Sequence, residues 1–161
     1  MIESDLLFMR EALKEAQKAF DADEVPIGAV LVFEGKVIAR GHNQVELLQD
    51  ATAHAEMICM TAGAAYLANW RLAKTTLYCT LEPCPMCAGA LLASRVERLV
   101  WAAPDLRLGA NGSWINLFTQ HHPMHEIDVT RGILEAEAAH LMVSFFQKKR
   151  NNGKKDSLSV R

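Results

Sequence analysis

The sequence predicts a single α/β domain in which a mixed five-stranded sheet lies between layers of helices. The chain has 161 residues, 50% of them hydrophobic, which suffices for one substantial core and not for two ordinary domains. Segments with helical periodicity alternate with apolar runs of strand length, the pattern of α/β proteins. Near the amino end, only Glu34-Gly35 separates two strand-like runs, so we expect the sheet to begin with an antiparallel hairpin.

The first part of the chain is expected to form a helix, the hairpin and a second helix. Leu6, Met9 and Leu13 recur at helical spacing, and the next apolar run lacks polar side chains, as expected of a strand covered on both faces. The second helix is expected to have Thr52 as its N-cap. The expected segments are helix 4–20, strands 27–33 and 36–40, loop 41–51 and helix 53–67.

The second part repeats the alternation of strands and helices. Its strands are expected at residues 76–81, 98–103 and 126–130, and its helices around 88–93, near 114–118 and over about 133–149. The short helix near 114–118 follows a glycine-bearing loop at 109–113. Residues 1–150 therefore form one predicted domain, and residues 151–161 a basic tail that we expect to be disordered.

Two short motifs contain side chains of the types that bind metals. These are His54-Ala55-Glu56 and Pro83-Cys84-Pro85-Met86-Cys87. One imidazole and two thiolates are ligands that Zn²⁺ prefers, and the Cys-x-x-Cys spacing places both sulfurs on one side of a first helical turn. A structural zinc site normally has four protein ligands, whereas three ligands leave a position for water. We therefore expect a catalytic zinc site.

Glu56 is the residue that this site would use for proton transfer. Zinc lowers the pKa of its water to about 7, and a carboxylate beside that water can accept the proton and deliver it to a leaving group. Cys59 and Cys79 are expected to be buried in regular elements and not to complete the site. A redox pair or half of a structural zinc site is the alternative for Cys84 and Cys87.

Three histidines, His121, His122 and His125, cluster before the last predicted strand. A second metal site would require acidic or thiol partners at matching spacing, so a polar loop is the preferred interpretation.

Charge and hydropathy bear on location and partners. The amino end lacks a basic start and an apolar run, and no apolar stretch approaches the roughly 20 residues of a membrane span, so a cytoplasmic protein is expected. The net charge of −2 hides a balance of +5 in residues 148–161. Such a basic end is either a nucleic-acid contact or a solvated terminus.

The motif residues resemble those of the zinc-dependent nucleoside and nucleobase deaminases, and more narrowly the bacterial tRNA adenosine deaminases. The similarity rests on residues 52–56 and 80–90 and extends to 24–30, the loop with Asn43, Asp105 with 109–113, and Phe145-Phe146. It implies a three-layer α/β/α fold of the cytidine-deaminase type and a homodimer with one zinc ion per subunit.

The resemblance also implies a reaction and a set of site residues. The reaction is hydrolytic deamination of adenosine to inosine at the wobble position, in the anticodon stem-loop of tRNA, by a zinc-activated water. His54, Cys84 and Cys87 would hold zinc, and Glu56 would shuttle protons. Substrate contacts would come from Asn43 on the flipped nucleotide, Asp105 near the sugar or flanking backbone, and Phe145 or Phe146 against a base. The basic tail would bind phosphates.

Two other functions share parts of this pattern. A deaminase of guanine or of a cytidine-type small molecule would have the same metal motif. A zinc-stabilised RNA-binding module without catalysis would keep the ligands and the basic tail but would not depend on Glu56.

Overall fold

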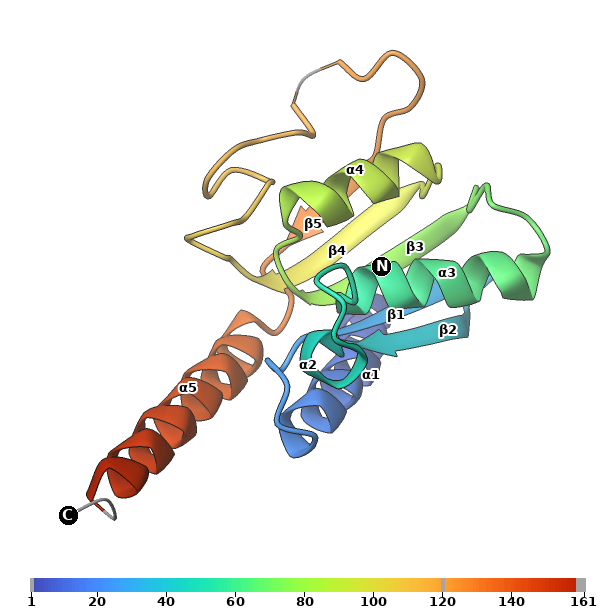
Figure 1. Ribbon diagram of the computed structural model, residues 1–161. Helices are drawn as coiled ribbons and strands as arrows, with labels where there is room; N and C mark the ends of the chain where they lie inside the picture. Colours follow the sequence, from blue (N-terminus) through green and yellow to red (C-terminus); the bar gives the residue numbers. More distant parts are fainter. Residues whose placement is uncertain (1, 120, 159–161) are drawn as a thin grey trace.

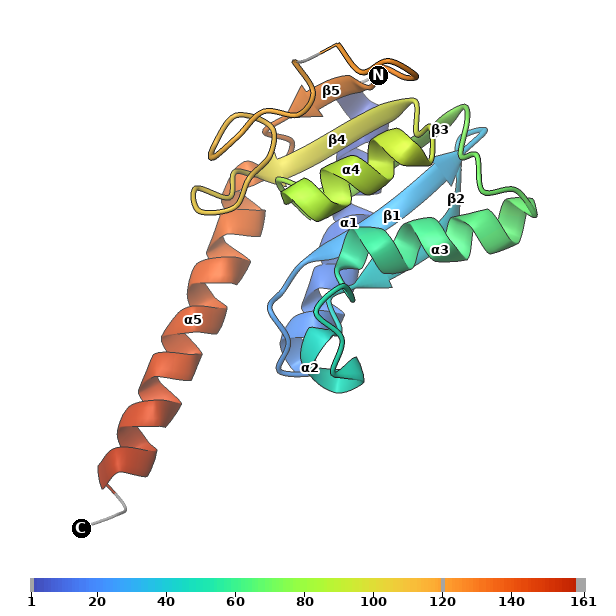
Figure 2. The same ribbon diagram turned by 45° about the horizontal axis from the view of Figure 1, so that its top comes forward.

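The computed structural model describes the backbone of residues 2–119 and 121–158, and their side chains as far as Lys154. The helices are α1 (Ile2–Asp21), α2 (Val45–Leu48), α3 (Ala55–Leu67), α4 (Pro85–Ala93) and α5 (Glu135–Leu158), and the strands are β1 (Gly28–Phe33), β2 (Lys36–His42), β3 (Thr75–Leu81), β4 (Arg98–Ala103) and β5 (Asp128–Arg131). Helix α1 covers one face of the sheet, and α3 and α4 cover the other (Figures 1 and 2). The predicted three-layer arrangement is confirmed.

The sheet has the strand order β2-β1-β3-β4-β5. Strand β1 runs antiparallel to both β2 and β3, whereas β3, β4 and β5 are parallel to one another. The sheet is therefore mixed, and it begins with the expected hairpin. Since β3 and β4 are parallel neighbours, their carboxyl ends, Leu81 and Ala103, lie side by side at one edge.

Alternate residues of the central strands point into two separate hydrophobic cores. Leu31 and Leu77 pack with Cys59 of α3 on one face, and Val30 and Tyr78 pack on the other face. The second core is closed by α1 and by the first turn of α5. Burial on both faces explains why the central strands are almost continuously apolar.

Gly28 permits close packing between α1 and β1. A Cβ atom built on this residue would lie 2.1 Å from the carbonyl oxygen of Ala12. The backbone of β1 can therefore approach that of α1 only because residue 28 has no side chain.

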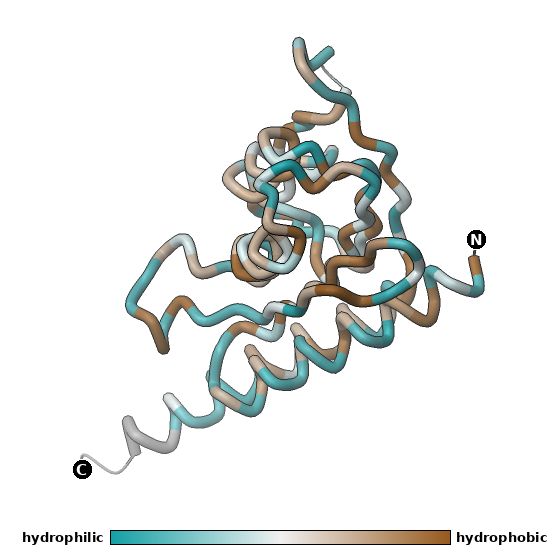
Figure 3. The backbone as a smooth tube through the Cα atoms, turned by 90° about the vertical axis from the view of Figure 1, so that its right-hand side faces the viewer, coloured by the Kyte–Doolittle hydropathy of each residue, from teal (hydrophilic) through white to brown (hydrophobic). Residues whose placement is uncertain are grey.

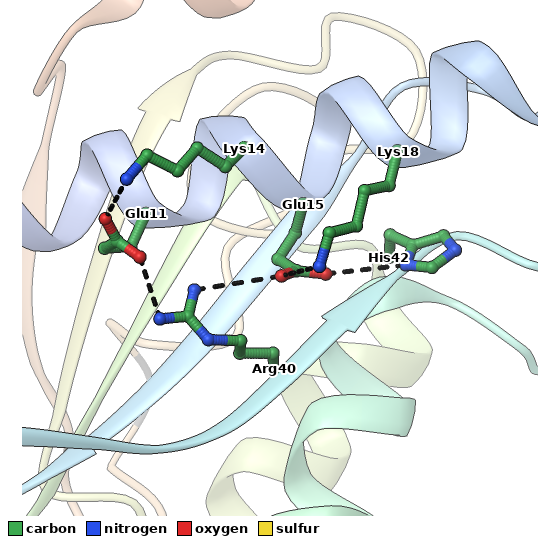
Figure 4. Close-up of polar contacts among 6 residues, drawn as sticks. All are labelled: Glu11, Lys14, Glu15, Lys18, Arg40 and His42. Carbon is green, nitrogen blue, oxygen red and sulfur yellow. Dashed lines mark hydrogen bonds and ion pairs between the residues drawn. The ribbon is translucent and has the colours of Figure 1, made fainter.

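A network of charged side chains fastens α1 to the edge strand β2 (Figure 4). Arg40 of β2 lies 2.8 Å from Glu11 and 3.8 Å from Glu15, both on α1. Glu15 is buried, and it also meets Lys18 at 2.7 Å and His42 at 3.5 Å. Because Glu15 has several polar partners, its burial does not leave an uncompensated charge.

Two predicted features of the first half differ from the structure. Residues 45–48 of the expected loop form the short helix α2, and β2 extends to His42. Helix α3 begins at Ala55 with His54 at the N-cap position, not Thr52. The hydroxyl of Thr52 instead donates to Asp50 at 2.7 Å, so it is not available to cap the helix.

The helix expected near residues 114–118 is absent from the structure, which has bends there and an isolated β-bridge between Asn116 and Asn111. The carbonyl of Gly109 accepts the N–H groups of Trp114 and Ile115, and the N–H groups of Asn111 and Ser113 point at the buried carboxylate of Glu82. Because these N–H groups bind other acceptors, they do not form the hydrogen bonds to carbonyls four residues earlier that an α-helix would require.

The end of the chain also differs from the expectation. Helix α5 continues through Leu158, where a disordered tail beyond residue 150 was expected, and residues 159–161 lie outside the described part. Extending an existing helix requires no new nucleation, so Asn151-Asn152-Gly153 does not end it. The coloured part of α5 near the carboxyl end is mostly hydrophilic and projects away from the sheet (Figure 3). None of the described helices is both long and apolar enough to span a bilayer.

Candidate metal centre and substrate pocket

The three predicted metal ligands come together at the starts of two adjacent helices. His54 directly precedes α3, Cys84 precedes α4, and Cys87 lies in the first turn of α4. Pro85 occupies the first position of α4, where no N–H donor is needed. The Nδ1 atom of His54 lies 3.6 Å from the Sγ atom of each cysteine. Among residues 2–119 and 121–158, this is the only group of three such side chains with converging ligand atoms.

The spacing of these atoms fits a tetrahedral zinc ion. With Zn–N and Zn–S bonds of about 2.05 and 2.3 Å, a tetrahedral angle places nitrogen and sulfur about 3.6 Å apart. Both of the N···S distances equal this value. The donor set of His54, Cys84 and Cys87 therefore fits zinc in chemistry and in geometry, and it leaves a fourth position for a non-protein ligand.

The pKa values of the three ligands are shifted in different directions. A hydrogen bond from Cys87, and a further one from His54, lower the pKa of Cys84 to about 4 against the opposing effect of burial. The same pairing raises the pKa of Cys87, and the hydrogen bond to Cys84 raises the pKa of His54. The pair thus contains one readily ionised thiol, and the thiolate is the form that binds metals.

Glu56 lies in the first turn of α3, beside the ligands. Its side chain is buried, and burial raises the pKa of its carboxyl group. It lines the same cavity as His54 and Cys84. A carboxyl group in this position can exchange protons with a molecule bound there. Cys59 and Cys79 are buried in the core, as expected, and do not join the three-ligand group.

The cavity over the ligands has a volume of about 220 Å³. This is below the range of about 300–1,000 Å³ typical of ligand pockets, which favours one ring system over a whole nucleotide. One wall comes from α2 and from the segments that join α1 to β1 and β2 to α2. The other comes from the end of β3 and the segments that follow β3 and β4, with Met142 of α5. The lining residues outside the metal group include Glu24, Val25, Ile27, Asn43, Val45, Glu46, Leu81, Glu82, Asp105, Arg107, Leu108 and Met142.

Two of the four predicted substrate-binding residues line this cavity. Asn43 is buried, and its N–H group donates to the carbonyl of Ile27 at 3.0 Å. Asp105 uses Oδ1 to accept the N–H groups of Arg107 and Leu108 at 3.1 and 3.3 Å. Asp105 therefore caps a turn at the end of β4 as well as facing the cavity.

The two predicted aromatic contacts, Phe145 and Phe146, do not line the 220 Å³ cavity. Phe145 is buried and packs edge-on against Phe20, with ring centroids 5.9 Å apart. Phe146 lines two neighbouring hollows of about 620 and 600 Å³ beside α5. Met142, one turn earlier on α5, reaches the cavity instead.

Two buried carboxylates in the cavity walls were missed by the sequence analysis. Glu24 accepts the N–H groups of Glu46 and Leu47 at 3.2 and 2.6 Å, which holds α2 against the cavity. Glu82 holds the opposite wall. In the sequence, Glu24 shortly precedes the apolar strand β1, and Glu82 directly follows the apolar strand β3. This position was the only available signal, because the hydrogen-bond partners of both carboxylates are far away in sequence.

The three clustered histidines do not belong to a group of three converging metal-ligand side chains in the described residues. His122 Nδ1 accepts the N–H groups of Met124 and His125, and His125 Nε2 lies 2.6 Å from the carbonyl of Val96. His121 is exposed and meets Glu126. The polar loop predicted here is confirmed.

Residues 2–103 match the family described as the cytidine and deoxycytidylate deaminase zinc-binding region. The chloroplastic tRNA(adenine(34)) deaminase of Arabidopsis thaliana is 57% identical over 159 residues, which cover 89% of this chain but only 12% of that protein. The tRNA-specific adenosine deaminase of Bacillus subtilis is 47% identical over 150 residues, and the match covers 93% of each chain.

Solved structures are similar over most of the chain. A structure from studies of A-to-I editing by tRNA:A34 deaminases at the wobble position of transfer RNA has a TM-score of 0.80 and 46% identity, covering 83% of this chain and 97% of the other. A guanine deaminase from Nitrosomonas europaea has a TM-score of 0.72 and 27% identity, covering 87% and 83%.

Proposed function

The chain belongs to the cytidine and deoxycytidylate deaminase family, and from this premise we infer that it is a zinc-dependent enzyme that deaminates adenosine to inosine in tRNA. The observation that carries the inference is the zinc-spaced triad of His54, Cys84 and Cys87 in one cavity with Glu56. The substrate follows from the relatives, because a tRNA-specific adenosine deaminase is 47% identical over nearly its whole length. The guanine deaminase is more distant, at 27% identity.

In this proposal, His54, Cys84 and Cys87 hold zinc, which when bound supplies an activated water for attack on C6 of the adenine ring. Glu56 would accept one proton from that water and deliver it to a ring nitrogen of adenine as the oxygen adds to C6. It would then take the remaining proton of the added hydroxyl group and transfer it to the exocyclic amine, so that the C6–N bond breaks, ammonia leaves and the C6 carbonyl of inosine forms. The narrow cavity admits the base and excludes bulk water, which strengthens the interactions of Glu56.

Substrate contacts are proposed for both walls of the cavity. Asn43 is placed to hydrogen-bond the adenine nucleotide inside the cavity. Asp105 lies near its mouth, in reach of the sugar or the flanking backbone. Phe146 adjoins the hollows on either side of α5, where a neighbouring base could stack on its ring, and the buried Phe145 supports it from behind.

The direct test is inosine formation from tRNA. Zinc-loaded protein would be incubated with total bacterial tRNA, and the digested nucleosides measured by mass spectrometry, with Glu56→Ala and its zinc content as the control. We expect inosine from the native protein, and no detectable inosine from a Glu56→Ala protein that still binds zinc. Ammonia release from free guanine or cytidine nucleotides without inosine would instead identify a small-molecule deaminase. RNA binding without either product would identify a binding module.

We also propose that the protein is a homodimer that pairs through the outer surfaces of α3 and α4. A helix that is apolar on all sides is ordinarily buried. Helix α4 contains no charged residue, and the only one in α3, Glu56, is buried. Tyr66 is exposed on this surface, and a Cβ atom built on Gly89 would meet nothing within 4 Å. A second copy would cover these apolar residues.

The dimer can be tested by sedimentation velocity. Gly89→Glu places a charge on the exposed side of α4, where it contacts nothing within the chain, and we expect it to produce monomers. Leu7→Glu, on the exposed side of α1, is the control and should leave the dimer intact. A monomeric native protein, or a dimer unaffected by Gly89→Glu, would contradict this interface.

A further inference from the structure

The carboxylate of Glu82 is buried in one wall of the substrate cavity. Glu82 follows the last residue of β3 and comes two residues before Cys84, and it is 2% exposed. The same wall includes part of the segment 104–113, which we term the 104–113 loop. Asp105, Arg107 and Leu108 of this loop line the cavity.

Four hydrogen bonds from the 104–113 loop converge on this carboxylate. Oε1 accepts the N–H groups of Asn111 and Ser113, at 2.8 and 3.2 Å. Oε2 accepts the N–H group of Asp105 at 3.1 Å and the hydroxyl group of Ser113. A carboxylate offers about four acceptor sites, so these donors occupy all of them. Glu82 therefore has no remaining acceptor for a substrate, which separates its role from that of Glu56.

Close packing and backbone hydrogen bonds fix the same loop against the metal-ligand segment. A Cβ atom on Gly109 would lie 2.3 Å from the carboxylate carbon of Glu82, so only glycine fits there. The N–H group of Ala110 donates to the carbonyl of Pro83 at 2.8 Å, directly before Cys84. In the other direction, the N–H group of Glu82 donates to the carbonyl of Ala103 at 2.8 Å.

We propose that Glu82 is a positioning residue that fixes the substrate-contacting 104–113 loop relative to the metal ligands. Among the described residues, Glu82 forms no ion pair, and its charge is stabilised by backbone and hydroxyl donors of this loop. The residues proposed to hold zinc and move protons lie at the starts of α3 and α4, outside the loop, so loosening the loop would disturb the placement of the substrate more than the chemistry. The expected changes in KM and kcat rest on the proposed deaminase function, whereas the position of the loop does not.

Glu82→Gln isolates the carboxylate with little change in shape. The amide NH₂ group would face two donors of the loop, and two of the four acceptor positions would be lost. Gly109→Ala disturbs the same contact from the loop side and keeps the carboxylate. Glu97→Gln is a matched control, because Glu97 is exposed and lies at the opposite end of β4.

Three measurements on the zinc-loaded proteins test the proposal. Amide hydrogen exchange at Asp105, Asn111 and Ser113 reports on the loop in the absence of RNA. Zinc content reports on the metal ligands. Steady-state kinetics with an anticodon stem-loop RNA separate KM from kcat.

We expect both variants to accelerate exchange at the three amides and to keep stoichiometric zinc. KM should rise about tenfold, as for the loss of one hydrogen bond to a charged group, with kcat changed by less than about threefold. Glu97→Gln should match the native protein in all three measurements.

Unchanged amide exchange in Glu82→Gln would overturn the proposal, as would a fall in kcat and zinc content with unchanged KM. If the native protein formed no inosine, the proposed function would fail, and hydrogen exchange would still decide whether Glu82 fixes the loop.

Discussion

Asp5 is the residue that connects α1 to the centre of the sheet. Its carboxylate receives two hydrogen bonds from Arg98 of β4, at 2.7 and 2.8 Å, and one from the hydroxyl of Tyr78 of β3, at 2.8 Å. The Asp5 side chain is almost completely buried. The hydrogen bonds from the Arg98 guanidinium group lower the pKa of Asp5, and this effect outweighs the burial of the carboxyl group, which raises the pKa. We therefore expect the charged carboxylate of Asp5 to make a large contribution to the stability of the folded protein.

The pH dependence of stability should reveal this contribution. Because the pKa of Asp5 in the folded protein lies below its ordinary value of 3.8, the stabilisation is complete above that value and is lost as the pH falls through the folded-state pKa. Asp5→Asn should lower the free energy of unfolding by about 2–3 kcal/mol at pH 7. We expect this difference to shrink as the pH falls below 3.8 and through the folded-state pKa of Asp5, in urea unfolding followed by circular dichroism.

Asp128→Asn provides the control for this measurement. Asp128 lies 3.7 Å from the same arginine, but its side chain is 77% exposed. Its loss should change the free energy of unfolding by less than about 0.5 kcal/mol. An Asp5→Asn effect that did not vary with pH would show that the ion pair is not its source.

For single residues, the sequence predicted those whose chemistry depends on a local motif. His54, Cys84 and Cys87 converge in the structure because each motif opens a helix, and Glu56 follows its histidine by two positions. Glu24 and Glu82 could not be predicted, because their partners lie in α2 and in the 104–113 loop, about 20 to 30 residues away in the chain. The positions of Phe145 and Phe146 depend on how α5 lies against α1, which periodicity does not specify.

The packing of α1 on β1 can be tested at Gly28. Gly28→Ala forces a Cβ atom against the carbonyl of Ala12 and the backbone nitrogen of Ala16, and neither backbone can yield independently. We expect the free energy of unfolding to fall by about 1–3 kcal/mol, the usual cost of overpacking, measured by urea denaturation.

Gly153→Ala is the same substitution in an open position of α5, where a built Cβ atom meets nothing within 4 Å. Alanine favours helix over glycine by up to about 1 kcal/mol, so stability should be unchanged or slightly higher. If both alanine variants behaved alike, the close approach at Gly28 would not be the determining factor.

For helices and strands, strong periodicity gave correct predictions, and weak local signals did not. The hairpin, the parallel strands and the long helices occur where they were expected, because apolar patterning over many residues determines what each can bury. The expected helix near 114–118 was wrong, because donors in this region bind Glu82, more than 25 residues earlier. The end of α5 was predicted as disordered from composition alone, which ignores the helix that precedes it.

For the molecule as a whole, the basic end of α5 is expected to bind RNA. Lys148, Arg150 and Lys154 are exposed on this part of the helix, and Lys149 lies 2.6 Å from Asp23, in the turn after α1. Deleting residues 148–161 should weaken tRNA binding and flatten its dependence on salt, because fewer counterions are released from the RNA. A fluorescence-anisotropy titration of labelled tRNA at several salt concentrations would measure both effects.

The control for the deletion is a chain of the same length in which Lys148, Arg150 and Lys154 are replaced by glutamine. This variant removes three of the six basic residues that the deletion removes. If charge is responsible, its affinity and salt dependence should lie between those of the native and truncated proteins. Identical affinity and salt slope in the native and truncated proteins would show that this end of the helix does not contact RNA.

The architecture of the site follows from the sheet as a whole. The carboxyl ends of the parallel strands β3 and β4 deliver Glu82 and Asp105 to one edge, where α3 and α4 also begin. The sequence predicted each of these elements but not their order across the sheet, since strand order depends on which faces pack together. The resemblance to known deaminases implied the three layers and the mixed sheet, but not the strand order.

Helix α5 has a further consequence for the size of the RNA that the protein selects. Its 24 residues span about 36 Å at the rise of an α-helix, and Met142 in its first half lines the cavity. The length of α5 would therefore set the distance between the reacting base, near one end of the helix, and the basic residues beyond its midpoint. A short oligonucleotide can fill the cavity without reaching those residues, whereas a stem-loop can contact both. The protein would then distinguish a stem-loop from a short oligonucleotide by the size of the RNA, independently of the chemistry at the base.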